Sequence, residues 1–292
     1  MSWNNTVNDF PFQRLLVTLL LIVLVIGFFS TQALRGQEWS EYQQLDSIYT
    51  VDDRAWDSLR YAVDKDSANL QAWLELIHLC KKRSDFDNEL LFATLAVRHT
   101  PDSARALYSL ADACLNNGLV EDALVPLRTA LTIEPRYVKA LTVLAEAYDM
   151  LYQHDSAVMY LDSAIICNPR NVQAHFQKAE LLYRIGQRVE SIESYREWAV
   201  LQPYKAEPWI KLGEVQCLIG DYEDALESLN YAFSLAPDVP EVLFLVATAK
   251  QGLGKRDEAR DAFRDFFFRF PTHKRALEAE ELARALGWKP GE

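Results

Sequence analysis

Apolar residues recur at intervals of three and four over most of the chain, the spacing that gathers them on one face of an α-helix. These amphipathic stretches come in pairs, and a proline follows each pair at a constant interval of 34 residues: Pro101, Pro135, Pro169, Pro203, Pro237 and Pro271. A proline inside a helix costs about 3 kcal/mol or more, so each proline belongs to a connection between helices. Residues 70–273 are therefore predicted to form six copies of one helical unit.

The six units, called repeats 1 to 6 with positions 1 to 34, begin at Leu70, Ala104, Val138, Val172, Ala206 and Pro240. Positions 8 and 20 are mostly small, as at Ala145 and Ala157, whereas positions 4 and 24 are mostly large and apolar. Small residues let two helices cross closely, and large ones fill the space between neighbouring pairs. Position 15 is glycine in four repeats, as expected just past a helix end. Each repeat is therefore predicted as helix, turn, helix.

Repeat 5 carries the fullest version of the pattern, AEPWIKLGEVQCLIGDYEDALESLNYAFSLAP (Ala206–Pro237). This stretch resembles the tetratricopeptide repeat family at Trp209, Leu212, Gly213, Gly220, Tyr222, Ala225, Leu229, Ala232 and Pro237. The resemblance implies an all-α fold, a right-handed α-solenoid of helix-turn-helix repeats. The other repeats depart from the pattern at five places, which leaves their local packing open: Ile77, Glu89, Tyr152, Lys178 and Trp198.

The pattern extends beyond both ends of the six repeats. Residues 35–69 are predicted to be a juxtamembrane, degenerate repeat, because positions 4, 20, 24 and 27 fall on Trp39, Ala55, Leu59 and Ala62. Trp39 and Tyr42 have a second interpretation, as aromatic residues at a membrane interface. Residues 274–292 are predicted to be a capping helix and tail, since a solenoid must cover the apolar face of its last unit.

The N-terminal part of the chain has a different composition. Residues 15–34 carry no charge and are long enough to cross a bilayer as a helix, so they are predicted to be a transmembrane signal anchor after a tail of residues 1–14. A cleaved signal peptide is the alternative, although its apolar region is usually shorter. One basic residue stands on each side, Arg14 and Arg35, and the α-amino group favours a cytoplasmic N-terminus. The repeats are thus expected on the far side, which in a bacterium is the periplasm.

Composition excludes several classes of function. The 292 residues have a net charge of −12 and no basic run, which argues against nucleic-acid binding. The five histidines form no zinc-type pair, and no catalytic or phosphate-binding motif is present, so we expect no metal, no cofactor and no enzymatic activity. Cys80 and Cys114 hold the same position in adjacent repeats, where helices about 8–10 Å apart are too distant for a disulfide. We predict free thiols.

The resemblance implies that positions 2, 5, 9 and 12 of the first helices line a concave groove that binds partners. The side chains predicted to contact a partner are Tyr108, Asp112, Glu146, Phe176, Glu180, Ile210, Glu214 and Phe244. The four acids recur at position 9, so stacked repeats would align like charges beside apolar residues at position 5. A cationic segment with apolar anchors fits this pattern, and a merely solvated acidic face is the alternative.

The stretch FRDFFFRF places Phe268 and Phe270 off the core positions. Packing under the terminal helix is one interpretation, and a partner-binding patch is the other.

Two functional hypotheses follow. The first is a membrane-tethered scaffold or adaptor that binds a client protein segment in the groove, in envelope protein biogenesis or secretion. The second is a structural subunit of a larger membrane complex, which would use the outer face of the repeats or Phe268 and Phe270.

Overall fold

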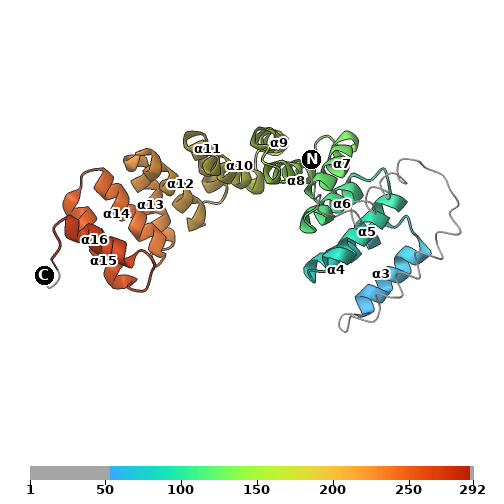
Figure 1. The fold of residues 1–292 in the computed structure, drawn as a ribbon, viewed down its shortest axis with the longest axis horizontal. Coiled ribbons are helices and arrows are strands. Elements are labelled where there is room, and N and C mark those ends of the chain that lie inside the picture. The colour runs from blue at the N-terminus through green and yellow to red at the C-terminus, as the bar shows by residue number, and fades with distance from the viewer. Residues whose placement is uncertain (1–52, 290–292) are drawn as a thin grey trace, which may run out of the picture. The chain divides into compact units, whose positions relative to one another are not determined.

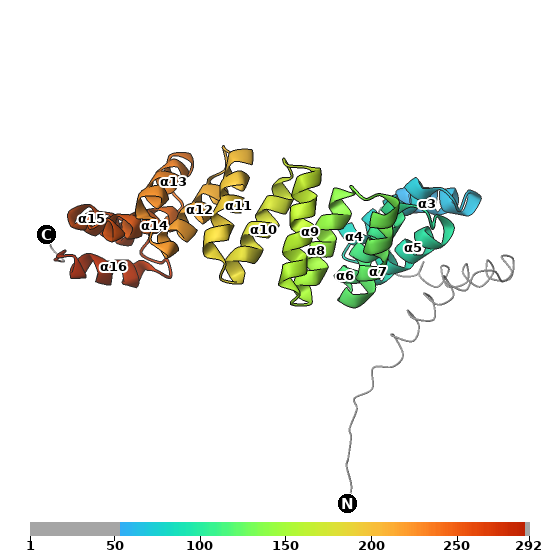
Figure 2. The same ribbon diagram turned by 90° about the horizontal axis from the view of Figure 1, so that it is seen from above.

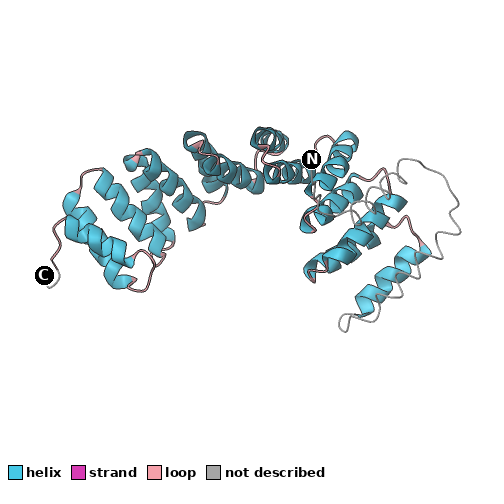
Figure 3. Ribbon diagram, in the orientation of Figure 1, coloured by secondary structure: helices cyan, strands magenta, loops and turns pink. Residues whose placement is uncertain are grey.

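The computed structural model describes residues 53–289, and all regular secondary structure in that range is α-helical (Figures 1 and 3). The predicted tail 1–14, the predicted span 15–34 and residues 35–52 of the degenerate repeat lie outside the described residues. No helix between residues 53 and 289 has the length and apolar character needed to cross a membrane. The helices are α3 (Asp53–Lys65), α4 (Leu70–Lys82), α5 (Phe86–His99), α6 (Ala104–Asn116), α7 (Val120–Ile133), α8 (Val138–Met150), α9 (His154–Cys167), α10 (Val172–Arg184), α11 (Arg188–Leu201), α12 (Ala206–Ile219), α13 (Tyr222–Leu235), α14 (Pro240–Gly252), α15 (Arg256–Arg269) and α16 (Ala276–Ala285).

The helices follow the 34-residue period. The first helices of the six repeats, α4, α6, α8, α10, α12 and α14, each begin at position 1, and the second helices each cover positions 17 to 30. Helix α3 lies where the second helix of the degenerate repeat was expected. The prediction of an all-α solenoid of helix-turn-helix units is confirmed.

The described helices fall into two compact units. Unit 1 contains α3 to α5, and unit 2 contains α6 to α16. In unit 1, α3 packs on α4, and the ring of Trp56 lies 5.5 Å from that of Phe92. Ile77 and Glu89, at positions that are usually small, are both buried here, with Glu89 0% exposed. Repeat 1 therefore tolerates larger residues where its two helices meet.

In unit 2, the helix pairs follow one another in chain order, and each second helix packs against the first helix of the next repeat (Figures 1 and 2). The small residues at positions 8 and 20 are buried in every repeat of this unit, as the sequence predicted. A Cβ atom added to Gly213 would lie 2.5 Å from Cγ of Leu229. The crossing of α12 and α13 is thus close enough to require glycine.

The turn between the two helices has the same conformation in all six repeats. Position 15 has a positive φ at its four glycines and also at Ser84 and Tyr152, with φ values of 57° and 58°. The left-handed conformation costs a non-glycine residue roughly 1–2 kcal/mol. Packing of the two helices therefore outweighs local preference at these two turns.

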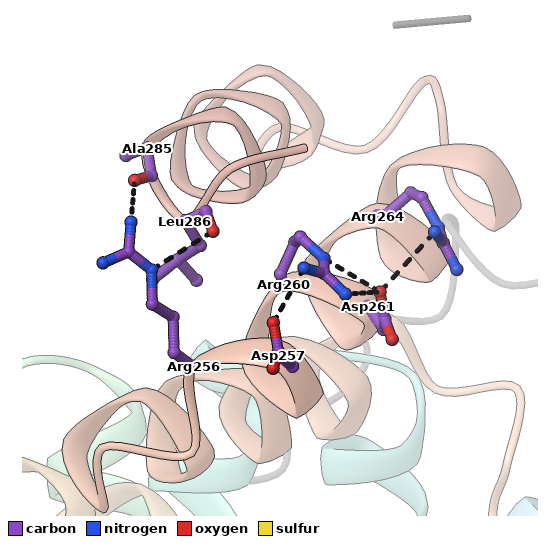
Figure 4. A network of polar contacts seen from close by, with 7 residues as sticks. All are labelled: Arg256, Asp257, Arg260, Asp261, Arg264, Ala285 and Leu286. Atoms are coloured by element: carbon purple, nitrogen blue, oxygen red, sulfur yellow. Dashed lines mark hydrogen bonds and ion pairs between the residues drawn. The ribbon is translucent and has the colours of Figure 1, made fainter. Parts of the chain in front are cut away.

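The last repeat is covered by α16, which packs on α15. Ala279, Ala283 and Trp288 are buried against Phe263 and Phe266. Arg256, at the start of α15, donates hydrogen bonds to the carbonyls at the C-terminal end of α16, those of Ala285 and Leu286 (Figure 4). Such a bond satisfies carbonyls that a helix end leaves free.

Phe268 and Phe270, which lie off the core positions, differ in how far they are buried. Phe270 is half-buried and packs against Phe266, with ring centroids 5.5 Å apart, so it joins the core. Phe268 is 63% exposed, and its ring makes T-shaped contacts with Trp288, at 5.8 Å between centroids, and with Phe267, at 5.4 Å. The packing interpretation is correct for Phe270, whereas most of Phe268 remains on the surface.

Candidate functional site

The eight predicted site residues lie on the first helices of repeats 2 to 6. Neighbouring first helices touch directly, α6 with α8, α8 with α10, and α12 with α14. Because each begins at position 1, positions 5 and 9 recur in register from helix to helix. The site is therefore a row of side chains from consecutive repeats of unit 2.

The N-terminal part of this row surrounds Tyr108. Its ring is half-buried and lies 5.5 Å from the ring of Tyr137. Burial raises the pKa of the Tyr108 hydroxyl, and the nearby carboxylates of Asp112 and Glu146 raise it further. These acids belong to different repeats, so repeats 2 and 3 contribute to one negatively charged environment, in which Glu146 is exposed.

The middle of the row is built on an aromatic cluster in repeat 4. Phe176 is half-buried, with its ring 4.8 Å from that of Trp198, and Trp198 lies 6.3 Å from Tyr195. Ile210, on the next first helix, is also half-buried. Like Tyr108, these two side chains are partly open to solvent.

Glu180 is held from two sides. The hydroxyl of the fully buried Tyr195 donates a hydrogen bond of 2.8 Å to Oε1 of Glu180, and Nζ of Lys211 lies 3.4 Å from the same oxygen. The expected repulsion between four aligned acids is thus partly offset at this position. Glu214, one repeat further on, is half-buried and makes no hydrogen bond or ion pair with residues 53–289.

Phe244 differs from its predicted place on an open groove. Only 4% of it is exposed, and its ring packs 5.4 Å from Phe263 and from Phe266. The guanidinium carbon of Arg275 lies 4.5 Å from the ring centroid. Arg275 comes from the segment that leads into α16, so the cap covers this residue in a way the repeat pattern did not indicate.

Two polar features near the row were missed by sequence reasoning. The residue at position 4 bonds to the backbone carbonyl six residues earlier in repeats 1 and 4, where Trp73 donates to Ser67 and His175 contacts Pro169. Trp209, at the same position in repeat 5, has a buried indole nitrogen without a hydrogen-bond partner among residues 53–289, and the same holds for the buried side-chain oxygen of Gln177. No signal in the repeat pattern separates Trp209 from Trp73.

Lys178, which departs from the repeat pattern at a core position, forms an ion pair with Asp162 of α9, with 2.6 Å between Nζ and Oδ1.

The cysteines Cys80, Cys114 and Cys217 are free and buried. Burial raises the pKa of Cys114 to about 12 and that of Cys217 to about 11. These thiols stay protonated at neutral pH and are poor nucleophiles. Within residues 53–289, no group of three His, Cys, Asp or Glu side chains could hold a metal ion.

Comparison with known proteins agrees with this architecture. A sequence model described as tetratricopeptide repeat matches residues 88–138. No relative was found among curated protein sequences.

Several solved structures share the fold. That of pilF from Pseudomonas aeruginosa is 15% identical, covers 75% of this chain and 99% of its own, and has a TM-score of 0.58. A tetratricopeptide repeat protein from Parabacteroides merdae is 15% identical, covers 76% and 94%, and has a TM-score of 0.52. YrrB, described as a tetratricopeptide repeat protein with an unusual peptide-binding site, is 20% identical, covers 63% and 95%, and has a TM-score of 0.50. At these identities the likeness concerns the fold.

Proteins of this architecture generally act as non-enzymatic scaffolds for protein–protein interaction, and their repeats present extended binding surfaces. The period of 34 residues agrees with the match of the tetratricopeptide repeat model to residues 88–138, and the solved structures share the helical-repeat fold.

Proposed function

We propose that this protein is a membrane-tethered scaffold that binds a segment of a client protein along the first helices of unit 2. The observation that carries the proposal is the row itself. Half-buried apolar side chains, Tyr108, Phe176 and Ile210, alternate with carboxylates in register from repeat to repeat. A surface with this composition suits a segment that carries Lys or Arg between apolar anchors.

Electrostatics would act mainly on the rate and selectivity of binding. Charge complementarity speeds diffusional encounter and disfavours wrong partners more than it raises affinity. Asp112, Glu146 and Glu214 supply the negative potential, while Lys211 offsets that of Glu180. Binding of the client should therefore weaken as the salt concentration rises.

The tether is residues 15–34, and the repeats would then lie in the periplasm or another extracytoplasmic space. A role in envelope protein biogenesis or secretion suits a scaffold in that position. The mature protein should retain Met1 or Ser2 and fractionate with membranes. An intact mass that lacks about 30 N-terminal residues, the usual extent of a signal peptide, would replace the anchor with a cleaved signal.

The client-binding proposal is tested by capture from detergent-solubilised membranes with the full-length chain. Replacing Glu146 and Glu214 together with Lys should reduce capture and flatten its salt dependence. Glu180 is left intact because its bonds to Tyr195 and Lys211 would confuse the result. The matched control replaces Glu223 and Glu227, exposed acids on the second helix α13, with Lys. Equal loss of capture in both variants, or in neither, would contradict a binding site on the first helices.

One observation favours the alternative of a structural subunit. Phe268 is a large apolar side chain that is 63% exposed on α15. In a permanently assembled complex such a side chain would be covered by a neighbouring subunit. If Phe268→Ser releases the protein from a stable complex while the Glu146 and Glu214 reversal does not, the structural role is the better account.

A further inference from the structure

Position 5 of the first helix is aromatic in alternate repeats of unit 2. The three residues are Tyr108 in repeat 2, Phe176 in repeat 4 and Phe244 in repeat 6. They occupy the same place on equivalent helices, yet their surroundings differ. The difference lies in the charge of the residue that stands 31 positions after each ring in the sequence.

At Phe244, the chain supplies a cation. The guanidinium carbon of Arg275 lies 4.5 Å from the ring centroid, a distance typical of a favourable cation–π contact. Phe263 and Phe266 pack on the same ring from the other helix of the repeat. The aromatic residue is thus held by the core on one side and covered by an arginine on the other.

Arg275 stands 31 residues after Phe244, which corresponds to position 2 of the following repeat unit. The residue 31 positions after Tyr108 is Lys139, again a cation. The residue 31 positions after Phe176 is Glu207, an exposed acid. Of the three rings, Phe176 therefore has an acid where each of the other two has a basic residue.

Like Phe244, Phe176 packs against an aromatic side chain of the second helix of its own repeat. Trp198 packs against it at 4.8 Å, while the residue as a whole is only half-buried. Glu207 and Glu214, on the next first helix, form no ion pair with the described residues. Lys211, a cation on the same helix as these two acids, is paired with Glu180.

We propose that Phe176 is a subsite for an arginine side chain of the client, which stacks on the ring as Arg275 stacks on Phe244 and pairs with Glu207 or Glu214. This inference rests on the proposed scaffold function and specifies its ligand. Arginine fits better than lysine because its planar guanidinium can stack on a ring and bond to a carboxylate at the same time. The contact between Arg275 and Phe244 is an example of the same arrangement within this chain.

Three capped peptides of sequence Gly-Leu-X-Leu-Gly, with X as arginine, lysine or citrulline, serve as probes. Citrulline keeps the planar shape without the charge, and lysine keeps the charge without the plane. Binding to the full-length chain in mild detergent is measured by calorimetric titration at low ionic strength. We expect the arginine peptide to bind about 3- to 10-fold more tightly than the citrulline peptide, the range of one cation–π contact. It should also bind more tightly than the lysine peptide, because an ammonium cannot stack on the ring and bond to a carboxylate with one planar group.

Two variants test the subsite. Phe176→Leu keeps an apolar side chain and should abolish the preference for arginine, whereas Phe268→Leu, a ring exposed on α15, should leave it intact. Glu207→Arg recreates the arrangement at Phe244, so its own guanidinium should occupy the ring and exclude the peptide. Glu223→Arg makes the same charge change on α13 and should weaken binding much less. Circular dichroism and the unfolding midpoint establish that each variant is folded.

The outcomes separate this subsite from the scaffold function. Equal binding of arginine and lysine peptides, or an arginine preference that survives Phe176→Leu, overturns the subsite. If no peptide binds while client capture still depends on Glu146 and Glu214, the subsite is also wrong and the scaffold function stands. Loss of that dependence would instead contradict the scaffold function itself.

Discussion

Repeats 3 and 4 have helices of the same length in the same register, but their second helices differ where they pack against the first helices. Positions 24 and 27 are Leu161 and Ala164 in repeat 3, and Tyr195 and Trp198 in repeat 4. All four side chains are buried. The two repeats therefore have the same backbone plan, with aliphatic side chains at these two positions in repeat 3 and large aromatic ones in repeat 4.

The difference reaches the candidate site. In repeat 4, Trp198 supports Phe176 and the hydroxyl of Tyr195 fixes Glu180. In repeat 3, the corresponding residues are Thr142, whose hydroxyl bonds to the backbone of its own helix, and Glu146, which is exposed. Residues inside the repeat thus decide whether its surface presents an aromatic ring and an acid positioned by the core, or a buried threonine and an exposed acid.

The largest expected effect comes from giving repeat 4 the residue that repeat 3 has at position 27. Trp198→Ala should destabilise the protein by about 3–5 kcal/mol, because it leaves a cavity beneath Phe176 that the helices cannot close. Chemical denaturation measures the loss. Tyr204→Ala, at a loop residue that is 87% exposed, is the control and should change stability by no more than about 0.5 kcal/mol. Equal shifts would mean that the aromatic core of repeat 4 is not packed as described.

A smaller loss is expected where repeats 3 and 4 are alike. Ala145→Leu at position 8 should cost about 1–3 kcal/mol, because the added atoms overpack the crossing of α8 and α9. Ala179→Leu should have the same effect in repeat 4. Gln153→Leu, at an exposed residue of repeat 3, should be nearly neutral. Similar unfolding midpoints for Ala145→Leu and Gln153→Leu would show that the assignment of position 8 is wrong.

Removal of the hydroxyl that links the core of repeat 4 to its surface has a still smaller effect. Tyr195→Phe loses the bond to Glu180 and should cost about 0.5–1.5 kcal/mol by denaturant titration. A variant with unchanged stability would show that the hydrogen bond from the Tyr195 hydroxyl to Glu180 contributes nothing.

The same residue predicts a dependence on alkaline pH. Burial raises the pKa of Tyr195, and the hydrogen bond to Glu180 raises it further. Above about pH 10, where an unfolded tyrosine ionises, the folded protein keeps its proton and the unfolded state is favoured. The contribution of Tyr195 to stability should therefore be complete below pH 10 and fall above it, so the alkaline loss of stability should be shallower in Tyr195→Phe. Part of the fall remains in that variant, because burial also raises the pKa of Tyr108 and of the buried cysteines.

The smallest expected effect concerns position 4 of repeats 4 and 5. Trp209→Phe removes an indole N–H that has no partner, so stability should change by less than about 0.5 kcal/mol or rise slightly. His175→Phe removes a ring nitrogen bonded to the carbonyl of Pro169 and should cost about 0.5–1.5 kcal/mol. The difference between the two unfolding free energies is the measurement. A larger loss for Trp209→Phe would mean that its indole nitrogen has a partner in solution.

The amino-acid sequence by itself determined where the helices of the repeats begin and which of their faces are buried. Small residues such as Ala145 and Ala157, spaced prolines and turn glycines are local signals, and each acts on the backbone within a few residues of itself. Because the period recurs six times, a single departure such as Tyr152 did not disturb the assignment. Its backbone adopts the left-handed turn that the neighbouring helices require.

Only the tertiary structure decided which side chains of the row remain available. Phe176 and Phe244 hold the same position, but Arg275, from outside the repeats, covers one of them. Glu180 and Glu214 likewise look equivalent in the sequence, yet Lys211 and Tyr195 reach only the first. The physical reason is that a helix pattern specifies the face on which a side chain lies, whereas its partners come from other helices, whose distance and orientation are set by packing of the whole unit.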